Sequence, residues 1–128
     1  MTDFTTDQLR LAFTHHTGQK IIAADRELQS SEMTALRSLV PREAMVAAGL
    51  VDHATGGFTP LFEAAVQAAF TQLGLRLDRA AKLDLLRVFV TVSGSDGEMH
   101  PNEAEVIGKA WQVLGEDPET LDAALAQL

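Results

Sequence analysis

Cysteine is absent from this sequence, and long hydrophobic runs are missing as well. Without cysteine the chain has no disulfide framework, no thiolate metal site and no cysteine nucleophile. No apolar stretch approaches the roughly 18 residues that a membrane span requires. The opening residues, MTDFTTDQ, carry two acids and no basic region of the kind that begins a secretory signal. We therefore expect a cytoplasmic protein without a membrane-inserted segment.

Basic residues are also scarce, because 10 lysines and arginines face 18 aspartates and glutamates, giving a formal net charge of -8. A field of this sign repels nucleic acid and anionic lipid surfaces and favours cations or basic protein surfaces as partners. The densest basic stretch is interleaved with acids and is best explained as a solvated helix face. It contains Arg76, Arg79, Lys82 and Arg87.

The remaining composition is that of an ordinary globular protein. Apolar residues make up 46% of the 128 residues and charged residues 22%, which excludes a disordered segment. A chain of this length has room for one hydrophobic core, so residues 1–128 are expected to form a single domain.

Strand signals are weak, whereas helix signals recur along the chain. Thr5 and Gln8 resemble a capping box that opens a helix over about residues 6–24. Proline, glycine and capping residues set the bounds of six more predicted helices. These run from Ser30 to Pro41, from Pro41 to Gly49, from Thr59 and Pro60 to Gly74, from Asp78 through Val92, from Pro101 to Gly115 and from Asp117 to Leu128. The fold class is therefore all-α, with about seven helices.

An internal repeat links the two halves of the sequence. At a constant offset of 71 residues, three acids of the first copy correspond to three acids of the second, and apolar neighbours such as Ile21 and Val92, or Leu36 and Ile107, repeat with them. The acid pairs are Asp25 and Asp96, Glu27 and Glu98, and Glu32 and Glu103. We expect repeat one at about 6–49, a connecting helix at about 60–73 and repeat two at about 78–128, packed as a compact bundle with pseudo-twofold character.

The second copy carries the most recognisable stretch, VFVTVSGSDGEMHPNEAEVIGKAWQVLG. A hydrophobic helix that runs into Asp-Gly-Glu, an apolar residue and a glutamate opening the next helix resembles the TerB-like tellurite-resistance family. The weaker first copy fits the same pattern, with Arg26 in place of the glycine. The resemblance implies an all-helical domain of stress and metal-resistance systems, with a clustered acidic surface proposed for metal binding and no known catalytic activity.

The repeated acids suggest a metal site. Calcium takes six to eight oxygen ligands, and two loops with three carboxylates each could supply them if the loops face one another. The candidate ligands are Asp25, Glu27, Glu32, Asp96, Glu98 and Glu103. A divalent cation, calcium in particular, is therefore the expected cofactor, and no organic cofactor is expected.

Simpler explanations of the same acids stay open. Glu32 and Glu103 can each cap the helix that they open, and the other four acids can be solvated loop charges. The acidic face can also bind a basic surface of a partner protein without any ion. An EF-hand is excluded, because its first and third ligand positions would be Val92 and Gly94, neither of which offers a side-chain ligand.

Other polar residues give weaker signals, and no enzymatic activity is predicted. His15 and His16 point about 100° apart on a helix and are expected at the surface or in the core. Ser93, Asp96 and His100 contain the residue types of a hydrolase triad but lack the strand and elbow that such a triad needs. Trp111 and the six phenylalanines are predicted to form the core.

Overall fold

The computed structural model describes residues 4–24, 30–93 and 101–128. These ranges form seven α-helices and one 3-10 helix: α1 (Thr6–Ala24), α2 (Ser30–Leu39), α3 (Arg42–Ala47), α4 (Pro60–Arg76), α5 (Arg79–Ser93), α6 (Pro101–Val113), η2 (Pro118–Thr120) and α7 (Leu121–Leu125). Within these ranges the only strand-like pairing is an isolated bridge between Val51 and Phe58. The prediction of an all-α bundle of about seven helices is confirmed.

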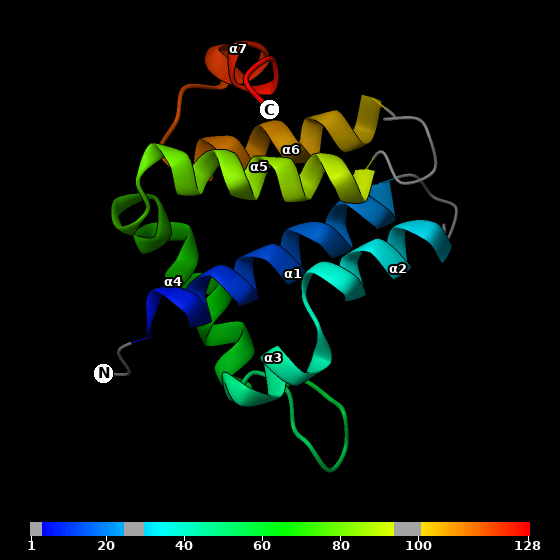
Figure 1. The fold of residues 1–128 in the computed structure, drawn as a ribbon. Coiled ribbons are helices and arrows are strands. Elements are labelled where there is room, and N and C mark those ends of the chain that lie inside the picture. The colour runs from blue at the N-terminus through cyan, green and yellow to red at the C-terminus, as the bar shows by residue number, and fades with distance from the viewer. Residues whose placement is uncertain (1–3, 25–29, 94–100) are drawn as a thin grey trace.

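Helix α1 lies at the centre of the bundle. It contacts α2, α3, α4, α5 and α6. Figure 1 shows α5 and α6 side by side, with α1 and α2 on one side of this pair and α7 on the other. Helix α4 crosses α1 steeply (Figure 1) and makes the most extensive packing contact with it.

The capping box at the start of α1 forms as predicted. The backbone N–H of Thr5 donates to the Gln8 side-chain oxygen at 2.9 Å, and the N–H of Gln8 donates to the Thr5 hydroxyl at 3.1 Å. These two bonds satisfy donors that the first turn of a helix otherwise leaves free, so the helix begins at Thr6.

Two of the three glycines that were predicted to end helices do so. Gly49 and Gly115 have φ angles of 79° and 86°, the left-handed backbone that only glycine adopts without strain. Gly74 was predicted to stop α4, and this is wrong, because the helix continues to Arg76. Gly74 instead permits a close approach, since a Cβ there would lie 2.6 Å from the carbonyl oxygen of Leu114.

Two other predicted helix ends also differ from the structure. Thr59 makes no side-chain cap to α4, because its hydroxyl donates to the Gly49 carbonyl at 2.7 Å. The last predicted helix is shorter than 117–128 and begins as the 3-10 turn η2, where Asp117 accepts from the N–H of Glu119. The predicted cap of α5 is present, since the Asp78 side chain accepts from the N–H of Ala81 at 2.8 Å.

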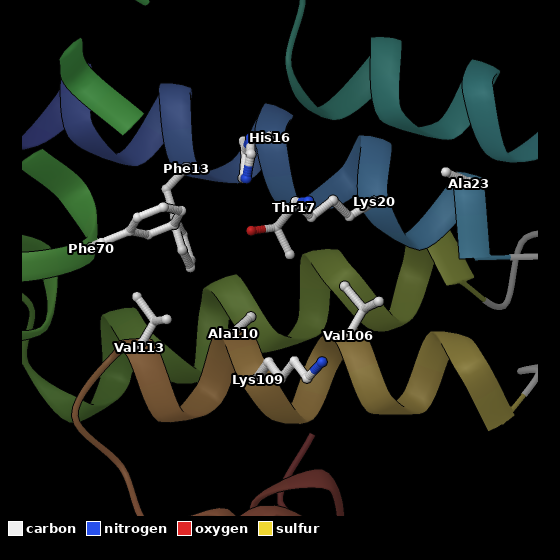
Figure 2. Close-up of a pocket in the computed structure, with 10 residues that line it drawn as sticks. All are labelled: Phe13, His16, Thr17, Lys20, Ala23, Phe70, Val106, Lys109, Ala110 and Val113. Carbon is white, nitrogen blue, oxygen red and sulfur yellow. The ribbon is translucent and has the colours of Figure 1, made fainter. Parts of the chain in front are cut away.

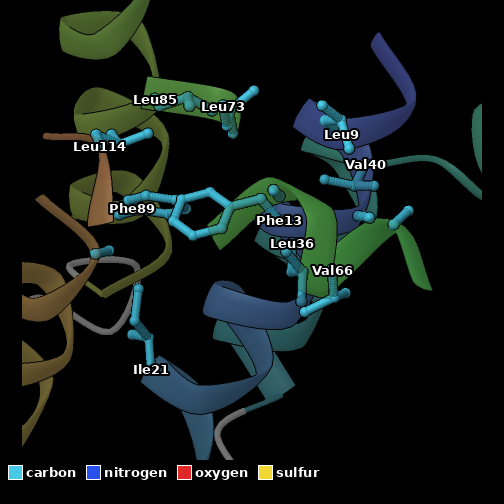
Figure 3. Packing of buried hydrophobic residues seen from close by; sticks show 14 of the residues in the cluster. Leu9, Phe13, Ile21, Leu36, Val40, Val66, Leu73, Leu85, Phe89 and Leu114 are labelled. Carbon is cyan, nitrogen blue, oxygen red and sulfur yellow. The ribbon is translucent and has the colours of Figure 1, made fainter. Parts of the chain in front are cut away.

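The core is one cluster of buried side chains drawn from most of the helices (Figure 3). Apolar positions that correspond at the offset of 71 are buried in both halves: Ile21 with Val92, Leu36 with Ile107, and Val40 with Trp111. The prediction that all six phenylalanines are core residues is wrong for two of them. Phe58 is 56% exposed, because it lies in the segment before α4, and Phe70 is 36% exposed although its ring meets Phe13 and His16 of α1.

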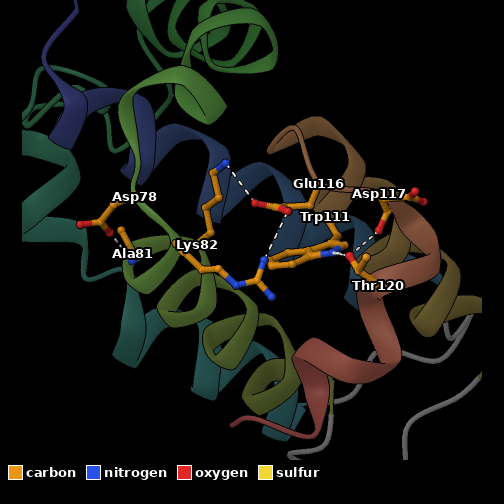
Figure 4. Close-up of polar contacts among 8 residues, drawn as sticks. Asp78, Ala81, Lys82, Trp111, Glu116, Asp117 and Thr120 are labelled. Atoms are coloured by element: carbon orange, nitrogen blue, oxygen red, sulfur yellow. Dashed lines mark hydrogen bonds and ion pairs between the residues drawn. The ribbon is translucent and has the colours of Figure 1, made fainter.

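Polar contacts tie the start of α5 to the segment after α6 (Figure 4). The Glu116 carboxylate pairs with Lys82 at 3.3 Å and with Arg79 at 3.4 Å. The indole N–H of Trp111 donates to the Thr120 hydroxyl at 3.1 Å, so this buried donor is satisfied. The predicted basic helix face is thus partly engaged in ion pairs.

Candidate functional site

The six predicted metal ligands fall mainly outside the described residues. Four of them belong to the segments 25–29 and 94–100: Asp25, Glu27, Asp96 and Glu98. Glu32 lies in the first turn of α2, where its side chain is not described, and Glu103 lies in the first turn of α6. His100 also falls outside the described residues.

The helix ends that border the two acidic segments lie together. Figure 1 shows that α1 and α5 end, and α2 and α6 begin, at the same end of the bundle, and Figure 2 shows the same arrangement for α1, α5 and α6. Contacts of α1 with α2 and of α5 with α2 and α6 agree with these views. The fold thus brings the bordering residues Ala24, Ser30, Ser93 and Pro101 to one region, although the chain separates the two pairs by some seventy residues.

Glu103 is the one predicted ligand whose side chain the structure describes, and it is fully buried. It occupies the third position of α6, after Pro101 and Asn102. A carboxylate in this position is favoured by the helix dipole and by free backbone donors. Full burial of a charged carboxylate is costly unless hydrogen bonds, a cation or protonation compensate for it, so Glu103 marks a polar site inside this end of the bundle.

The described residues do not form a metal site by themselves. In residues 4–24, 30–93 and 101–128, no group of three or more histidine, aspartate or glutamate side chains is placed to hold an ion. A site at this end of the bundle would therefore need acids from 25–29 and 94–100.

Ser93 is buried in α5, and the other two residues of the triad considered from the sequence, Asp96 and His100, lie outside the described residues. Within the part of the chain that the structure describes, the Ser93 hydroxyl has no hydrogen-bond partner. A nucleophilic serine needs a base within hydrogen-bond reach, so the described geometry offers no activation of Ser93.

The two adjacent histidines of α1 pack against aromatic rings, as one of the predicted alternatives requires. The His15 ring lies edge-on to Phe58 and Phe62, with centroid distances of 5.2 and 5.8 Å. The His16 ring lies edge-on to Phe70 at 5.6 Å. Burial lowers the pKa of His15, and the neighbouring His16 lowers it further. Burial and then Lys20 lower the pKa of His16, against an opposing effect of Glu63.

The lowered pKa of His15 predicts that acid weakens the fold. The unfolded chain takes up a proton at the ordinary histidine pKa, whereas folded His15 does so only at lower pH, so the free energy of unfolding falls as the pH drops from about 7.5 to about 5.5. Replacing His15 with phenylalanine keeps an aromatic ring and removes the titration. Urea unfolding at both pH values should give a smaller difference for His15→Phe than for the parent protein. Equal differences would contradict this explanation.

A pocket of about 520 Å³ lies between α1 and α6 and was not predicted from the sequence (Figure 2). Its walls are formed by residues at helical spacing on the facing surfaces of α1 and α6, and Phe70 of α4 lies at one end. The lining residues are Phe13, His16, Thr17, Lys20 and Ala23 of α1, Phe70 of α4, and Val106, Lys109, Ala110 and Val113 of α6. Its volume lies within the range of roughly 300–1,000 Å³ that is typical of small-molecule sites.

Comparison with protein families matches residues 14–126 to the family described as tellurite resistance protein TerB. The match covers nearly the whole chain and includes both acidic segments. Searches of curated proteins and of solved structures give no match. None of the described helices is both long and apolar enough to cross a membrane.

Proposed function

The chain belongs to the TerB family, and we propose that it is a non-enzymatic domain that binds a divalent cation through its two acidic segments. The proposed ligands are Asp25, Glu27, Glu32, Asp96, Glu98 and Glu103. Calcium is the proposed ion, because it accepts six to eight oxygen ligands in flexible geometry. The proposed setting is a cytoplasmic stress or tellurite-resistance system.

The observation that carries this proposal is the convergence of four helix ends. The helix ends that border both acidic segments lie at one end of the bundle (Figure 1), which supports a site shared by the two segments. The fully buried carboxylate of Glu103 at the same end supplies a hard oxygen ligand of the kind that calcium prefers.

Electrostatics supports a cation at this place. Two carboxylates about 6 Å apart repel by roughly 3 kcal/mol at an effective dielectric constant of about 20. Six such groups in one region require a compensating cation, protonation or a basic partner. The two segments themselves provide one arginine, Arg26, and one histidine, His100, which is too little positive charge for six acids.

Calcium should therefore stabilise the fold. At a free concentration of about 100 times the dissociation constant, a ligand that binds only the folded state adds roughly 2.7 kcal/mol to the free energy of unfolding. For a chain of this size the melting temperature should rise by about 10 °C. The measurement is a thermal melt followed by circular dichroism, first with a chelator and then with increasing calcium at constant ionic strength.

Matched variants distinguish a site from general screening of charge. Asp96→Asn with Glu98→Gln should abolish the calcium response, and Glu103→Gln should reduce it. Glu119→Gln with Asp122→Asn removes the same charge from exposed positions of η2 and α7 and should leave the response intact. A response that survives Asp96→Asn with Glu98→Gln would show that the ligands are assigned wrongly.

The alternative function is a protein-interaction module whose acidic face binds a basic partner surface without an ion. The net charge of -8 favours this partner class as well. Absence of any calcium-dependent stabilisation in the parent protein would favour this alternative over the metal site.

A further inference from the structure

The pocket between α1 and α6 has an apolar end and a cationic rim. Phe13, Phe70 and Val113 lie at one end of it (Figure 2). The rings of Phe13 and Phe70 meet edge-on, with centroids 6.2 Å apart. Farther along, Lys20 on α1 and Lys109 on α6 lie on opposite walls of the pocket (Figure 2). A ligand in this space can place an apolar part against the two rings and an anionic part beside the lysines.

The positive charge at the rim is unusual for this protein. The chain has three lysines, and two of them line this pocket, although the net charge is -8. In the described part of the chain Lys20 forms no ion pair with a carboxylate. Lys109 pairs with Glu105 at 3.3 Å, but both side chains are largely exposed, and such surface pairs are weak enough to be exchanged for a ligand.

A hydroxyl group also faces the pocket. Thr17 is only 4% exposed, and its side chain extends from α1 toward α6 (Figure 2). Thr17 lines the pocket, whereas the hydroxyl of Thr14 on the same helix donates to the Arg10 carbonyl at 2.6 Å. A threonine hydroxyl carries one O–H donor, so Thr17 offers a hydrogen bond to an anion bound in the pocket.

We propose that this pocket binds a straight-chain carboxylate, that is, a molecule of the fatty-acid class. The carboxylate lies between the ammonium groups of Lys20 and Lys109 and accepts a hydrogen bond from Thr17. The alkyl chain lies against Phe13 and Phe70. The volume of about 520 Å³ is that of a small-molecule site, whereas a protein partner needs about 800 Å² of surface from each side. A small amphiphilic anion therefore fits better than a polypeptide.

Isothermal titration calorimetry with dodecanoate below its micellar concentration tests the proposal. We expect one site per chain, and NMR contacts between the terminal methyl group of dodecanoate and the Phe70 ring. Lys20→Gln with Lys109→Gln should weaken binding about tenfold, because two charge-assisted contacts are lost. 1-Dodecanol, which has the same chain and no charge, should bind the parent protein at least tenfold more weakly than dodecanoate.

The control variant removes two positive charges elsewhere. Arg37→Gln with Arg87→Gln changes exposed residues of α2 and α5 that do not line the pocket, and it should bind dodecanoate as the parent protein does. Circular dichroism should show the same helix content in both double variants. The proposal is overturned if dodecanoate does not bind, if the alcohol binds as tightly as the carboxylate, or if the lysine variant keeps full affinity.

Discussion

Replacing Phe13 with alanine is expected to lower the free energy of unfolding by about 4 kcal/mol, the typical cost of emptying the space of a buried phenylalanine. Phe13 is 1% exposed. Its ring meets the rings of Phe70 and Phe89 edge-on, with centroids 6.2 and 5.9 Å apart. One side chain of α1 thus joins α4 and α5 in the middle of the core (Figure 3). Urea unfolding of the parent and the variant measures the loss.

The matched control for Phe13→Ala is Phe58→Ala. Phe58 stacks on Phe62 with centroids 4.2 Å apart, but it is 56% exposed. Its removal should cost only about 1 kcal/mol, the typical contribution of an aromatic pair. Similar losses for the two variants would mean that the core is not centred on Phe13.

Replacing Gly74 with alanine should lower the free energy of unfolding by about 3 kcal/mol. In an isolated helix this change would stabilise by about 0.5–1 kcal/mol, because glycine is a poor helix former. Here the new Cβ would lie 2.6 Å from the carbonyl oxygen and 2.7 Å from the carbonyl carbon of Leu114. Backbone atoms cannot rotate away as a side chain can, so α4 and the end of α6 must separate, at the upper end of the usual cost of overpacking.

Gly108 provides the opposite case within the same protein. It also lies inside a helix, but a Cβ there would meet only the Leu121 side chain at 3.7 Å, an ordinary contact. Gly108→Ala should therefore stabilise by about 0.5–1 kcal/mol. Urea unfolding of both variants gives the two signs. Stabilisation by Gly74→Ala would show that α4 and Leu114 are not in close contact.

Features that depend on neighbouring residues could be predicted from the sequence. The capping box of Thr5 and Gln8 is complete within four residues, and the helix begins where it predicts. Gly49 and Gly115 end helices because left-handed backbone is a local requirement. The resemblance to the TerB family and the all-α fold expected from the helix signals are both confirmed.

Features that depend on distant partners could not be predicted. Gly74 is predicted to end a helix, but its role in the structure is to allow the close approach of Leu114. Thr59 is predicted to cap a helix, but its hydroxyl donates to the Gly49 carbonyl instead. The exposed fractions of Phe58 and Phe70 depend on which distant side chains cover the two rings in the folded chain.

The candidate sites also combine features that the sequence predicts with features that only the fold shows. The repeat predicted which acids correspond, but only the arrangement of the helices shows that the ends bordering both acidic segments meet (Figure 1). The pocket of Lys20 and Lys109 exists because α1 and α6 lie face to face. No pattern within either helix alone indicates that contact.

The central position of α1 has a consequence for synthesis on the ribosome. Its apolar surfaces are covered by α4, α5 and α6, all of which are translated later. While the nascent chain ends before α4, Phe13 lacks the rings of Phe70 and Phe89 that it meets in the native fold, and such exposed surface attracts chaperones and other chains. The two halves of the sequence therefore do not fold one after the other. The native core forms only after the second half has left the exit tunnel.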